Sequence, residues 1–348
     1  MTAPLHLAIV VDSDAFGGAE VYAQRLVCWL PQHIRRTVIV AEPVAEHFGG
    51  ERRVVPLHRH RAHAPAVANL LAELRPDVVQ VNLVDPASNL AALDAAVAAA
   101  PTVATLHLQG TPPQRAFPAA DFAVAPSATI AAQLRDLGMP ADRVVRIRHG
   151  VELPPAAVKP RHRTPVVIGT VARLTPQKGL DLLIDAVSRL TGRGYRIELR
   201  IAGAGRDADA LRERARGLPV TFTGLCRDVP AFLRDLDVFC LPSRREALSL
   251  SLLEAVSHGL PCVSSDVGDT AEALTGAALI VPPEDVGALT DALRSLLDDP
   301  ARRADLGARA RERALAELDV RRWAQDWAAV LHRAAVSRAA RRPAPARR

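Results

Sequence analysis

The stretch that decides the fold runs from residue 166 to residue 190. It reads Val166-Val-Ile-Gly-Thr-Val171, then Ala-Arg173-Leu-Thr-Pro-Gln-Lys178-Gly179, then Leu180-Asp-Leu-Leu-Ile-Asp-Ala-Val-Ser-Arg-Leu190. The first six residues form a short apolar run, which predicts a buried strand. A turn with Pro and Gly follows and opens onto a helix. A strand, a turn and a helix in this order predict one unit of a parallel α/β sheet.

The same alternation of apolar runs and helical stretches continues along the whole chain. Further strands are expected at Leu5–Val11, Thr37–Val40, Val78–Val81 and Val103–Leu106, and at Ile197–Ile201, Val220–Phe222, Val238–Leu241, Cys262–Ser264 and Leu279–Val281. The predicted fold class is α/β, with two doubly wound, Rossmann-like parallel sheets that are each covered by helices on both faces. A chain of 348 residues is too long for one compact core and fits two domains.

A proline-rich stretch, residues 148–165, predicts a linker between the two domains. We therefore expect an N-terminal domain at residues 1–150, a linker at 151–165, a C-terminal domain at 166–320, and at 321–348 a helix that crosses back toward the N-terminal domain, followed by a basic tail. Open α/β sheets bind ligands beyond the carboxyl ends of their strands. We thus expect the site in a cleft between the domains.

The helical pattern from Pro300 to about Arg333 predicts a set of buried positions on its apolar side. These are Leu306, Ala310, Leu315, Leu318 and Trp323.

Composition excludes several classes of protein. The net charge is +6, but the arginines are scattered along predicted helices and crowd only at residues 341–348, which does not indicate nucleic-acid binding. The four cysteines form no CxxC pair, so neither a zinc site nor a disulfide framework is indicated. We find neither a signal-peptide pattern nor an apolar run of membrane-spanning length. A soluble, cytoplasmic protein is expected.

Two cations lie at the ends of the turn that follows Val171. Arg173 and Lys178, above the N-terminus of a helix, form a good pair for binding a diphosphate, and we call them the diphosphate clamp. Of 44 basic residues only Lys159 and Lys178 are lysines, so a lysine at this turn suggests a need for a compact charge. The alternative is that both are ordinary surface bases on a loop.

The second motif is Glu246-Ala-Leu-Ser-Leu-Ser-Leu-Leu-Glu254, which follows the strand Val238–Leu241. On one helix the two glutamates would lie about 80° apart around the axis, so they would not form an acid/base pair. Ser249 as the N-cap would leave Glu246 in the loop and Glu254 on the helix, with the first helix amides free for a phosphate. Taken alone, Glu254 is also compatible with a helix carboxylate that has a local partner.

These residues closely resemble the retaining glycosyltransferases of family 4, of the glycosyl transferases group 1 type, which have the GT-B fold. The resemblance also includes Phe222-Thr-Gly224, Asp266-Val-Gly268, Gly17-Gly18-Ala19-Glu20 and Pro76-Asp77-Val-Val79, and it covers about residues 5–330. It implies that the N-terminal domain, residues 1–150, binds the acceptor and that the C-terminal domain, residues 166–320, binds the nucleotide sugar. It also implies that Arg173 and Lys178 bind the donor diphosphate, that Glu246 contacts the donor sugar and that Glu254 holds the ribose.

The resemblance implies further binding residues. The base should lie against the backbone of Gly224, Leu225 and Cys226, and the helix start at Leu248, Ser249 and Leu250 should meet the diphosphate. Gly17 and Gly18 should approach the phosphate and acceptor side, and His107 should reach the donor sugar as a catalytic residue beside Arg173, Lys178 and Glu246. Each has an alternative: glycines at such a turn are often only a tight turn, and a histidine is often only packed or solvated.

This sequence departs from the family pattern at four positions. Ala247 and Ser249 stand where the family commonly has glycine, Asp269 replaces the second glycine of a pair, and His149 replaces an asparagine. These changes bear on donor selectivity more than on donor binding.

No metal or other cofactor is expected. The D-x-D triplet occurs three times, beginning at Asp12, Asp207 and Asp235, so it carries little information. The expected partners are a nucleotide-sugar co-substrate and an acceptor. The resemblance implies retention of anomeric configuration, and we expect front-face substitution in which the diphosphate clamp stabilises the leaving diphosphate.

The function predicted is transfer of a hexose or N-acetylhexosamine, with UDP-N-acetylglucosamine as the first guess, to a small soluble acceptor. The arginine- and alanine-rich composition resembles that of enzymes that glycosylate natural products, which suggests an aminocyclitol acceptor and antibiotic biosynthesis. One alternative is a lipid or cell-envelope acceptor at a membrane surface, which the basic residues His58, His60, Arg61 and His63 would favour. Another is a nucleotide-sugar-binding protein or an epimerase of the same fold.

Overall fold

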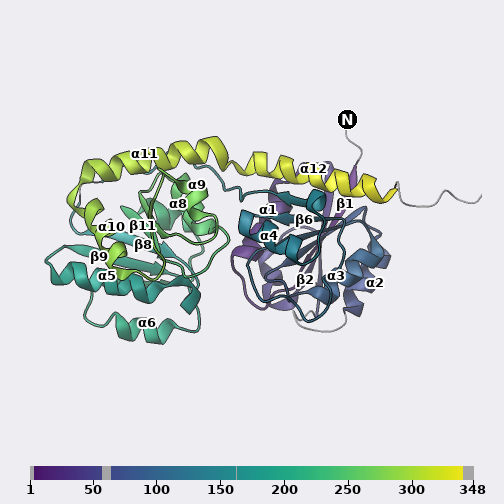
Figure 1. Cartoon of the computed structure of the whole chain (residues 1–348), viewed down its shortest axis with the longest axis horizontal. Coiled ribbons are helices and arrows are strands. Elements are labelled where there is room, and N and C mark those ends of the chain that lie inside the picture. The colour runs from purple at the N-terminus through teal and green to yellow at the C-terminus, as the bar shows by residue number, and fades with distance from the viewer. Residues whose placement is uncertain (1–3, 57–63, 162, 340–348) are drawn as a thin grey trace, which may run out of the picture. The chain divides into compact units, whose positions relative to one another are not determined.

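The computed structural model describes residues 4–56, 64–161 and 163–339. The chain forms two compact units, coloured by residue number in Figure 1. Unit 1 contains residues 1–150 and 320–348, and unit 2 contains residues 151–319. Each unit therefore has a sheet and a hydrophobic core of its own.

Unit 1 contains a seven-stranded parallel sheet in the order β3-β2-β1-β4-β5-β6-β7. Its strands are β1 (Leu5–Val11), β2 (Ile34–Ala41), β3 (Arg52–Val55), β4 (Val78–Leu83), β5 (Thr102–Leu106), β6 (Phe122–Ala125) and β7 (Val144–Arg146). Its helices are α1 (Gly18–Trp29), α2 (Pro65–Leu74), α3 (Leu90–Ala99), α4 (Ala128–Asp136) and α12 (Val320–Ala339), with short 3-10 turns η1 (Glu42–His47) and η2 (Ala141–Arg143).

The strand order reverses in the middle of this sheet. The chain moves outward from β1 to β2 and β3, and returns to pair β4 with the other side of β1. Doubly wound sheets bind ligands beyond the carboxyl ends of their strands at such a reversal. In unit 1 the residues Asp12–Gly17 and Val84–Asn89 follow these two strands.

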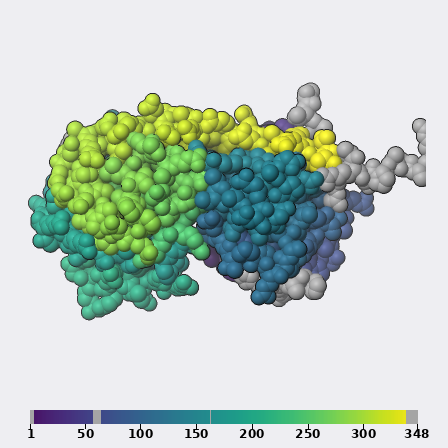
Figure 2. All heavy atoms as spheres, viewed as in Figure 1, coloured from purple at the N-terminus to yellow at the C-terminus, as the bar shows by residue number. Residues whose placement is uncertain are grey.

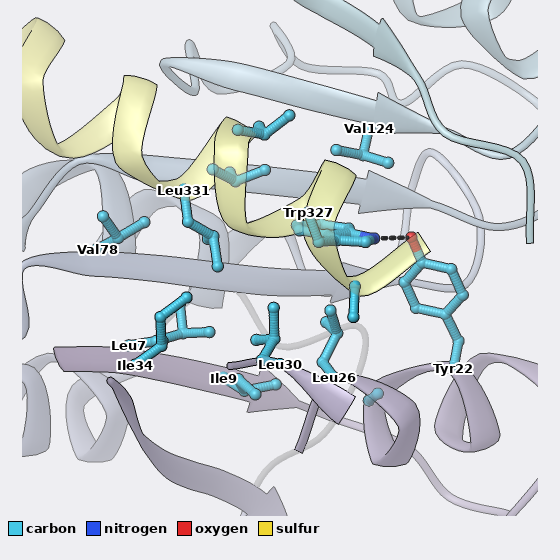
Figure 3. Close-up of a cluster of buried hydrophobic side chains, with 14 of the residues drawn as sticks. Leu7, Ile9, Tyr22, Leu26, Leu30, Ile34, Val78, Val124, Trp327 and Leu331 are labelled. Carbon is cyan, nitrogen blue, oxygen red and sulfur yellow. Dashed lines mark hydrogen bonds between the residues drawn. The ribbon is translucent and has the colours of Figure 1, made fainter. Parts of the chain in front are cut away.

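Helix α12 completes the core of unit 1 from the far end of the sequence. Figure 3 shows Trp327 and Leu331 of α12 among side chains from the strands and from α1. Trp327 is fully buried, and its indole Nε1 donates a hydrogen bond of 2.7 Å to the hydroxyl of Tyr22. Losing a buried tryptophan side chain typically costs about 3–5 kcal/mol. Unit 1 thus needs both of its chain segments, and the outer side of α12 lies at its surface (Figures 1 and 2).

Unit 2 contains a six-stranded parallel sheet in the order β10-β9-β8-β11-β12-β13. Its strands are β8 (Val166–Val171), β9 (Ile197–Ala202), β10 (Val220–Gly224), β11 (Val238–Leu241), β12 (Cys262–Ser265) and β13 (Leu279–Val281). Its helices are α5 (Leu180–Gly192), α6 (Ala208–Arg214), α7 (Val229–Arg234), α8 (Leu250–Ser257), α9 (Thr270–Leu274), α10 (Val286–Asp298) and α11 (Pro300–Glu317), with a 3-10 turn η3 (Pro176–Lys178).

The strand order of unit 2 reverses between β8 and β11, which pair through Ile168 with Val238 and Gly169 with Phe239. The predicted α/β class with two doubly wound parallel sheets is confirmed. Three strands of unit 1 were not expected: β3, β6 and β7. They have only three or four residues, and the exposed arginines of β3 and β7 interrupt the apolar pattern.

The C-terminal helical stretch differs from its prediction in one buried position. Leu306, Ala310 and Leu318 are buried in unit 2, and Trp323 is buried in unit 1, but Leu315 is 55% exposed. Positions 306, 310 and 314 follow one another at a spacing of four residues and share the buried face of α11, so residue 315 lies about 100° away from that face. The stretch is also two helices, because α11 ends at Glu317 and α12 begins at Val320.

The proline-rich segment is attached to unit 2. The amide of Val158 donates to the carbonyl of His258 at 2.7 Å, and Arg311 of α11 donates to the carbonyl of Pro154 at 2.6 Å. Arg163 pairs with the buried carboxylate of Asp237 at 2.7 Å. Because these contacts join the segment to α8, α11 and the start of β11, it is part of the body of unit 2.

Within the described part of the chain, we find no helix that combines the length and the apolar character needed to cross a bilayer.

Candidate functional site

The reversal of strand order in unit 2 brings together the two loops that carry the main sequence motifs. Residues 172–179 follow β8, and residues 242–249 follow β11. Because β8 and β11 are parallel neighbours, both loops leave the same edge of the sheet. Lys178 of the first loop and Glu246 of the second loop meet there, and the lysine Nζ contacts Oε1 of the carboxylate. The structure thus brings together two of the residues that the sequence singled out.

The carboxylate of Glu246 is held through one of its two oxygens. Oε1 accepts hydrogen bonds from Lys178 and, at 3.0 Å, from the hydroxyl of Ser243. Oε2 makes no hydrogen bond with a residue that the structure describes. Since the Glu246 side chain is only 8% exposed, its orientation is fixed, and Oε2 is left to accept a bond from a ligand.

The two cations of the diphosphate clamp differ in their surroundings. Lys178 is 13% exposed and uses its ammonium for Glu246, which leaves two of its three donors for another partner. Arg173 is exposed, and within the described residues its guanidinium has no ion-pair partner. The backbone on either side is fixed, since the Leu174 amide donates to the carbonyl of Ala204 at 2.9 Å. An anion can therefore bind Arg173 without breaking an existing ion pair.

Arg244 ties the two loops together, and sequence reasoning missed this residue. Its guanidinium makes a two-pronged pair with Asp181 of α5 at 2.8 and 2.7 Å, and donates to the carbonyl of Pro176 at 2.8 Å. The hydrogen bonds from Arg244 hold the pKa of Asp181 below its usual value. The pair is thus ionised and fixes the loop of Glu246 to the turn of Lys178. A separation of 63 residues left no local signal for this contact.

Gly179 allows the turn of Lys178 to lie close to the loop that carries Glu246. Its φ of 62° is in the left-handed region, and a Cβ at this position would overlap the carbonyl oxygen of Pro242. Only glycine combines this conformation with this contact. The glycine that ends the Lys178 turn is therefore required by the fold of the site itself.

The start of α8 presents backbone amides without a side-chain cap. The helix begins at Leu250 after Ser249, as predicted, but the Ser249 hydroxyl does not cap it and lies 3.2 Å from the hydroxyl of Ser251. By contrast, Asp285 caps α10 and Asp299 caps α11. Uncapped amides at a helix N-terminus favour an anion. Leu248, Ser249 and Leu250 are themselves buried, so a ligand would meet their backbone.

The Asp266-Val-Gly268 motif supports the backbone of the Glu246 loop. Gly268 has a φ of 57°, and a Cβ there would overlap the carbonyl oxygens of Glu246 and Ala247. Next to it, the Asp269 amide donates to the Ala247 carbonyl at 2.9 Å. The motif therefore supports the Glu246 loop through contacts with the backbone carbonyls of Glu246 and Ala247, which the spacing in the sequence did not reveal.

One residue expected to hold the ribose, Glu254, acts electrostatically on one residue expected to meet the base, Cys226. Glu254 is half-buried on α8, and Cys226 follows β10 in the segment of Gly224 and Leu225. Burial raises the pKa of the Cys226 thiol, a hydrogen bond with the backbone of Asp228 opposes this, and the negative charges of Asp228 and Glu254 raise the pKa further. Glu254 is thus within electrostatic range of Cys226. The side chain of Leu225 is 62% exposed and offers an apolar surface.

The remaining candidates, Gly17, Gly18 and His107, belong to unit 1. Gly17 and Gly18 stand at the start of α1, and a Cβ at Gly18 would meet no atom within 4 Å. Neither a left-handed φ nor internal packing therefore requires glycine at position 18. His107 follows β5, is 7% exposed, and its Nε2 lies 2.6 Å from Oδ1 of Asn82. Burial lowers the pKa of His107 to about 3, so the ring is neutral.

No group of His, Cys, Asp or Glu side chains suited to hold a metal ion occurs within residues 4–56, 64–161 and 163–339. In the last D-x-D triplet both carboxylates are used in ion pairs, Asp235 with Arg161 and Asp237 with Arg163. The basic residues at 58–63 and the tail at 341–348 lie outside the described residues.

Two family models match the chain, one in each half. Residues 16–153 match Glycosyltransferase Family 4, and residues 165–299 match Glycosyl transferases group 1. Together the two matches span most of the chain, and each falls largely within one of the two units.

Curated proteins match over shorter stretches. The chain is 36% identical over 166 residues to a GDP-mannose-dependent monoacylated alpha-(1-6)-phosphatidylinositol monomannoside mannosyltransferase from Corynebacterium glutamicum, which covers 44% of each chain. It is 33% identical over 144 residues to the alpha-D-kanosaminyltransferase of Streptomyces kanamyceticus, covering 39% of this chain and 37% of that protein. The chain thus matches less than half the length of these relatives.

The solved structure of the Anabaena protein HepE, in complex with UDP and glucose, has the same fold. It superimposes with a TM-score of 0.78 at 19% sequence identity, over 94% of this chain and 99% of that one. The predicted GT-B fold is confirmed.

Proposed function

The chain belongs to the family 4 and group 1 glycosyltransferases, and on this basis we propose that it transfers a sugar from a nucleotide diphosphate sugar to an acceptor. One observation carries the proposal: Lys178 and Glu246 meet at the carboxyl ends of β8 and β11, beside the uncapped start of α8. Cationic donors and helix amides are suited to a diphosphate, and a carboxylate is suited to a sugar hydroxyl.

The diphosphate clamp has its greatest effect when the bond to the sugar breaks. Negative charge then grows on the departing diphosphate, and groups already fixed around it stabilise that charge without reorganising. Lys178 offers two donors, and Arg173 offers a guanidinium that no described residue occupies. The role of the clamp is thus to lower the barrier to departure of the leaving group.

Glu246 acts in this proposal as an orienting group. Its Oε1 is used by Lys178 and Ser243, so Oε2 accepts from a hydroxyl of the donor sugar. The reaction proceeds by front-face substitution with retention: the bond from the anomeric carbon to the diphosphate oxygen breaks, a bond from that carbon to the acceptor oxygen forms, and the acceptor proton passes to the diphosphate. No covalent intermediate on a carboxylate is part of this scheme.

For the donor we propose a hexose or an N-acetylhexosamine, with UDP-N-acetylglucosamine tested first. The relatives differ in this respect, because HepE was crystallised with UDP and glucose, whereas the Corynebacterium enzyme is named for GDP-mannose. For the acceptor we propose a small soluble molecule, a choice that the similarity to a kanosaminyltransferase supports. A lipid acceptor is the alternative, since the other relative is named for a phosphatidylinositol monomannoside.

A thermal-shift panel tests the donor site first. UDP, GDP and their sugars are added to the wild type and to Glu254→Ala, with and without magnesium. A ligand that binds the folded state raises the melting temperature by mass action. We expect one nucleotide class to shift the wild type and to shift Glu254→Ala less. No shift with any nucleotide at millimolar concentration would contradict the proposal.

Product analysis then tests the acceptor. The donor that binds is supplied with a labelled sugar, together with either an aminocyclitol or a phosphatidylinositol extract. Label in a water-soluble product supports the small acceptor, and label that partitions into the organic phase supports the lipid acceptor. If the nucleotide diphosphate sugar binds but its label reaches neither acceptor nor water, the protein is a nucleotide-sugar-binding protein and the transferase proposal is wrong.

A further inference from the structure

A cavity of about 160 Å³ lies at the amino ends of the strands in unit 2. It is lined by the residues just before β11 and β12, by the proline-rich segment and by the first half of α11. Lys178 and Glu246 follow β8 and β11, at the carboxyl ends of the same parallel sheet. The cavity is therefore at the opposite edge of the sheet from the candidate donor site.

The walls of this cavity are joined by close backbone contacts. Gly307 of α11 lies against the loop before β12, because a Cβ at this position would overlap the carbonyl oxygen of Gly259. The amide of Val158 donates to the carbonyl of His258 at 2.7 Å and joins the proline-rich segment to the same loop. The cavity is thus formed by the chain itself, before any ligand binds.

Apolar side chains from all of these elements line the cavity. They include Val158, Leu236, Leu260, Pro261, Pro300 and Ala304. The volume is well below the roughly 300–1,000 Å³ of clefts that hold drug-sized ligands. A nucleotide is therefore too large for this cavity, and a small molecule with an apolar body fits it.

Arg303 of α11 contributes a buried cation to the wall. It is only 7% exposed, and its Nη1 donates to the carbonyls of Leu296 and Leu297 at the C-terminal end of α10, where a cation is favourable. Among all residues that the structure describes, Arg303 has no acidic partner, and its Nε and Nη2 donate no hydrogen bond. Arginines are almost never this buried without a paired charge. The guanidinium is thus fixed through one nitrogen and lacks a counter-ion.

The unused edge of Arg303 has the geometry that binds a carboxylate. Nε and Nη2 lie side by side on the planar guanidinium, and Arg214 uses the same two nitrogens to hold the carboxylate of Asp185 at 2.7 and 2.6 Å. In Arg303 neither of these nitrogens is enclosed by the protein, so a ligand in the cavity can reach them.

The other charged side chains of the wall do not supply the missing counter-ion. Asp237 pairs with Arg163 at 2.7 Å, and its second oxygen is enclosed. Arg161 pairs with Asp235 at 2.9 Å. Lys159 is exposed, so water screens its charge. The charge of Arg303 is therefore the one that a buried ligand would meet.

We propose that this cavity binds a small monocarboxylate, whose carboxylate pairs with Nε and Nη2 of Arg303 and whose apolar body lies between α11 and the loop before β12. The inference does not depend on the proposed function, because every residue that carries it lies at the amino edge of the sheet in unit 2.

Nuclear magnetic resonance tests the contact with Arg303. Linear carboxylates from acetate to hexanoate are titrated into the full chain labelled with ¹⁵N in its arginines, and Arg303→Lys identifies the Nε signal of Arg303. We expect this signal to shift, with affinity rising about fourfold for each added methylene group until the cavity is full. Affinity that does not rise along the series, or shifts confined to other arginines, would overturn the inference.

Two further probes test the chemistry of the ligand. 1-Pentanol has the apolar body without the charge, and we expect it to bind at least about tenfold more weakly than pentanoate, as for loss of a charged hydrogen bond. Inorganic phosphate has the charge without the apolar body and should also bind more weakly. If phosphate shifted the Arg303 signal at lower concentration than every carboxylate, the proposed ligand class would be wrong.

Variants with a matched control test the cavity itself, with saturation-transfer measurements on pentanoate as the readout. Ala304→Leu fills the cavity and should weaken binding at least about tenfold, whereas Ala301→Leu, at an exposed position of α11 outside the wall, should not change it. Arg303→Lys keeps the charge but not the planar fork, so it should also weaken binding. Equal affinities in the two leucine variants, or full affinity in Arg303→Lys, would refute the site.

Lys178→Met distinguishes this cavity from the diphosphate clamp, which could also attract an anion. We expect pentanoate to bind this variant and the wild type equally, because Lys178 lies at the opposite edge of the sheet. Loss of pentanoate binding in Lys178→Met would show that the carboxylate binds at the clamp, and it would overturn the inference while leaving the proposed function intact.

Discussion

Replacing Arg244 with methionine should loosen the site while leaving the fold intact. The guanidinium makes two hydrogen bonds with Asp181, at 2.8 and 2.7 Å, and one with the carbonyl of Pro176 at 2.8 Å. The side chains of Arg244 and Asp181 are 27% and 32% exposed. Buried charged bonds contribute about 1.5–3 kcal/mol and exposed pairs about 0–1 kcal/mol. This partly buried set lies between these limits, so we expect a loss of about 2 kcal/mol in the free energy of unfolding.

The main effect of Arg244→Met should be on the rate of sugar transfer. Arg244 fixes the loop of Glu246 to the turn of Lys178, and small displacements of reacting groups can reduce rates by roughly a hundredfold. We expect a tenfold or greater fall in kcat/KM, on the order given by that geometric argument. Urea denaturation measures the stability, and release of the nucleoside diphosphate measures the rate.

Arg214→Met provides a matched control, because the carboxylate that Arg214 pairs with lies on α5, as Asp181 does. Arg214 also makes a two-pronged pair, with Asp185 of α5 at 2.7 and 2.6 Å, but its side chain is 48% exposed and is not attached to either loop. We expect it to lose at most about 1 kcal/mol of stability and no activity. If Arg244→Met turned over donor as fast as Arg214→Met does, the proposed tie between the loops would be refuted.

Two further predictions concern stability. Gly179→Ala combines a left-handed φ with overlap of the Pro242 carbonyl, so it should lower the free energy of unfolding by about 3 kcal/mol. Gly194→Ala has a φ of 87° but its Cβ would enter open space, so it should lower that free energy by only about 1 kcal/mol. Equal losses for the two variants in urea denaturation would contradict the packing argument. Burial lowers the pKa of His107 to about 3 and also lowers the pKa of His149. Between pH 6.5 and 5.5 the unfolded chain therefore takes up protons at these two histidines that the folded chain does not. As the pH falls, each histidine reduces the free energy of unfolding by up to about 1.4 kcal/mol per pH unit. His149→Asn should therefore flatten the pH dependence of the unfolding free energy, and an unchanged slope would show that His149 binds its proton equally in the folded and unfolded states.

Much of the fold could be predicted because it depends on local patterns. The run Val166–Val171 and its turn identify a strand and a helix start by themselves, and the structure has both. The short strand Val144–Arg146 could not be found in this way, because only its pairing with β6 makes it a strand. Leu315 was predicted to be buried and is exposed, since one apolar residue does not show which side of α11 faces the core.

In the site, too, local motifs could be predicted, whereas contacts between distant segments could not. Lys178 and Glu246 stand in recognisable motifs, and their contact follows from the reversal of strand order. Ser243 and Arg244 were missed as site residues, and the contact of Asn82 with His107 was missed as well, because these contacts join residues that only the folded chain brings near. Arg244 is 63 residues from Asp181 in the sequence, and Asn82 is 25 residues from His107. No local spacing encodes such pairs.

Titration calorimetry of Lys178→Met with the nucleotide that binds the wild type tests the central claim most directly. The chain provides a matched control, because its only other lysine, Lys159, is exposed in unit 2. If Lys178 binds the diphosphate, the variant should lose roughly ten- to a hundredfold in affinity for both the nucleotide sugar and the free nucleoside diphosphate, as expected for a charged hydrogen bond, and Lys159→Met should lose none. Unchanged affinity in a folded Lys178→Met protein would contradict the diphosphate clamp and the function proposed from it.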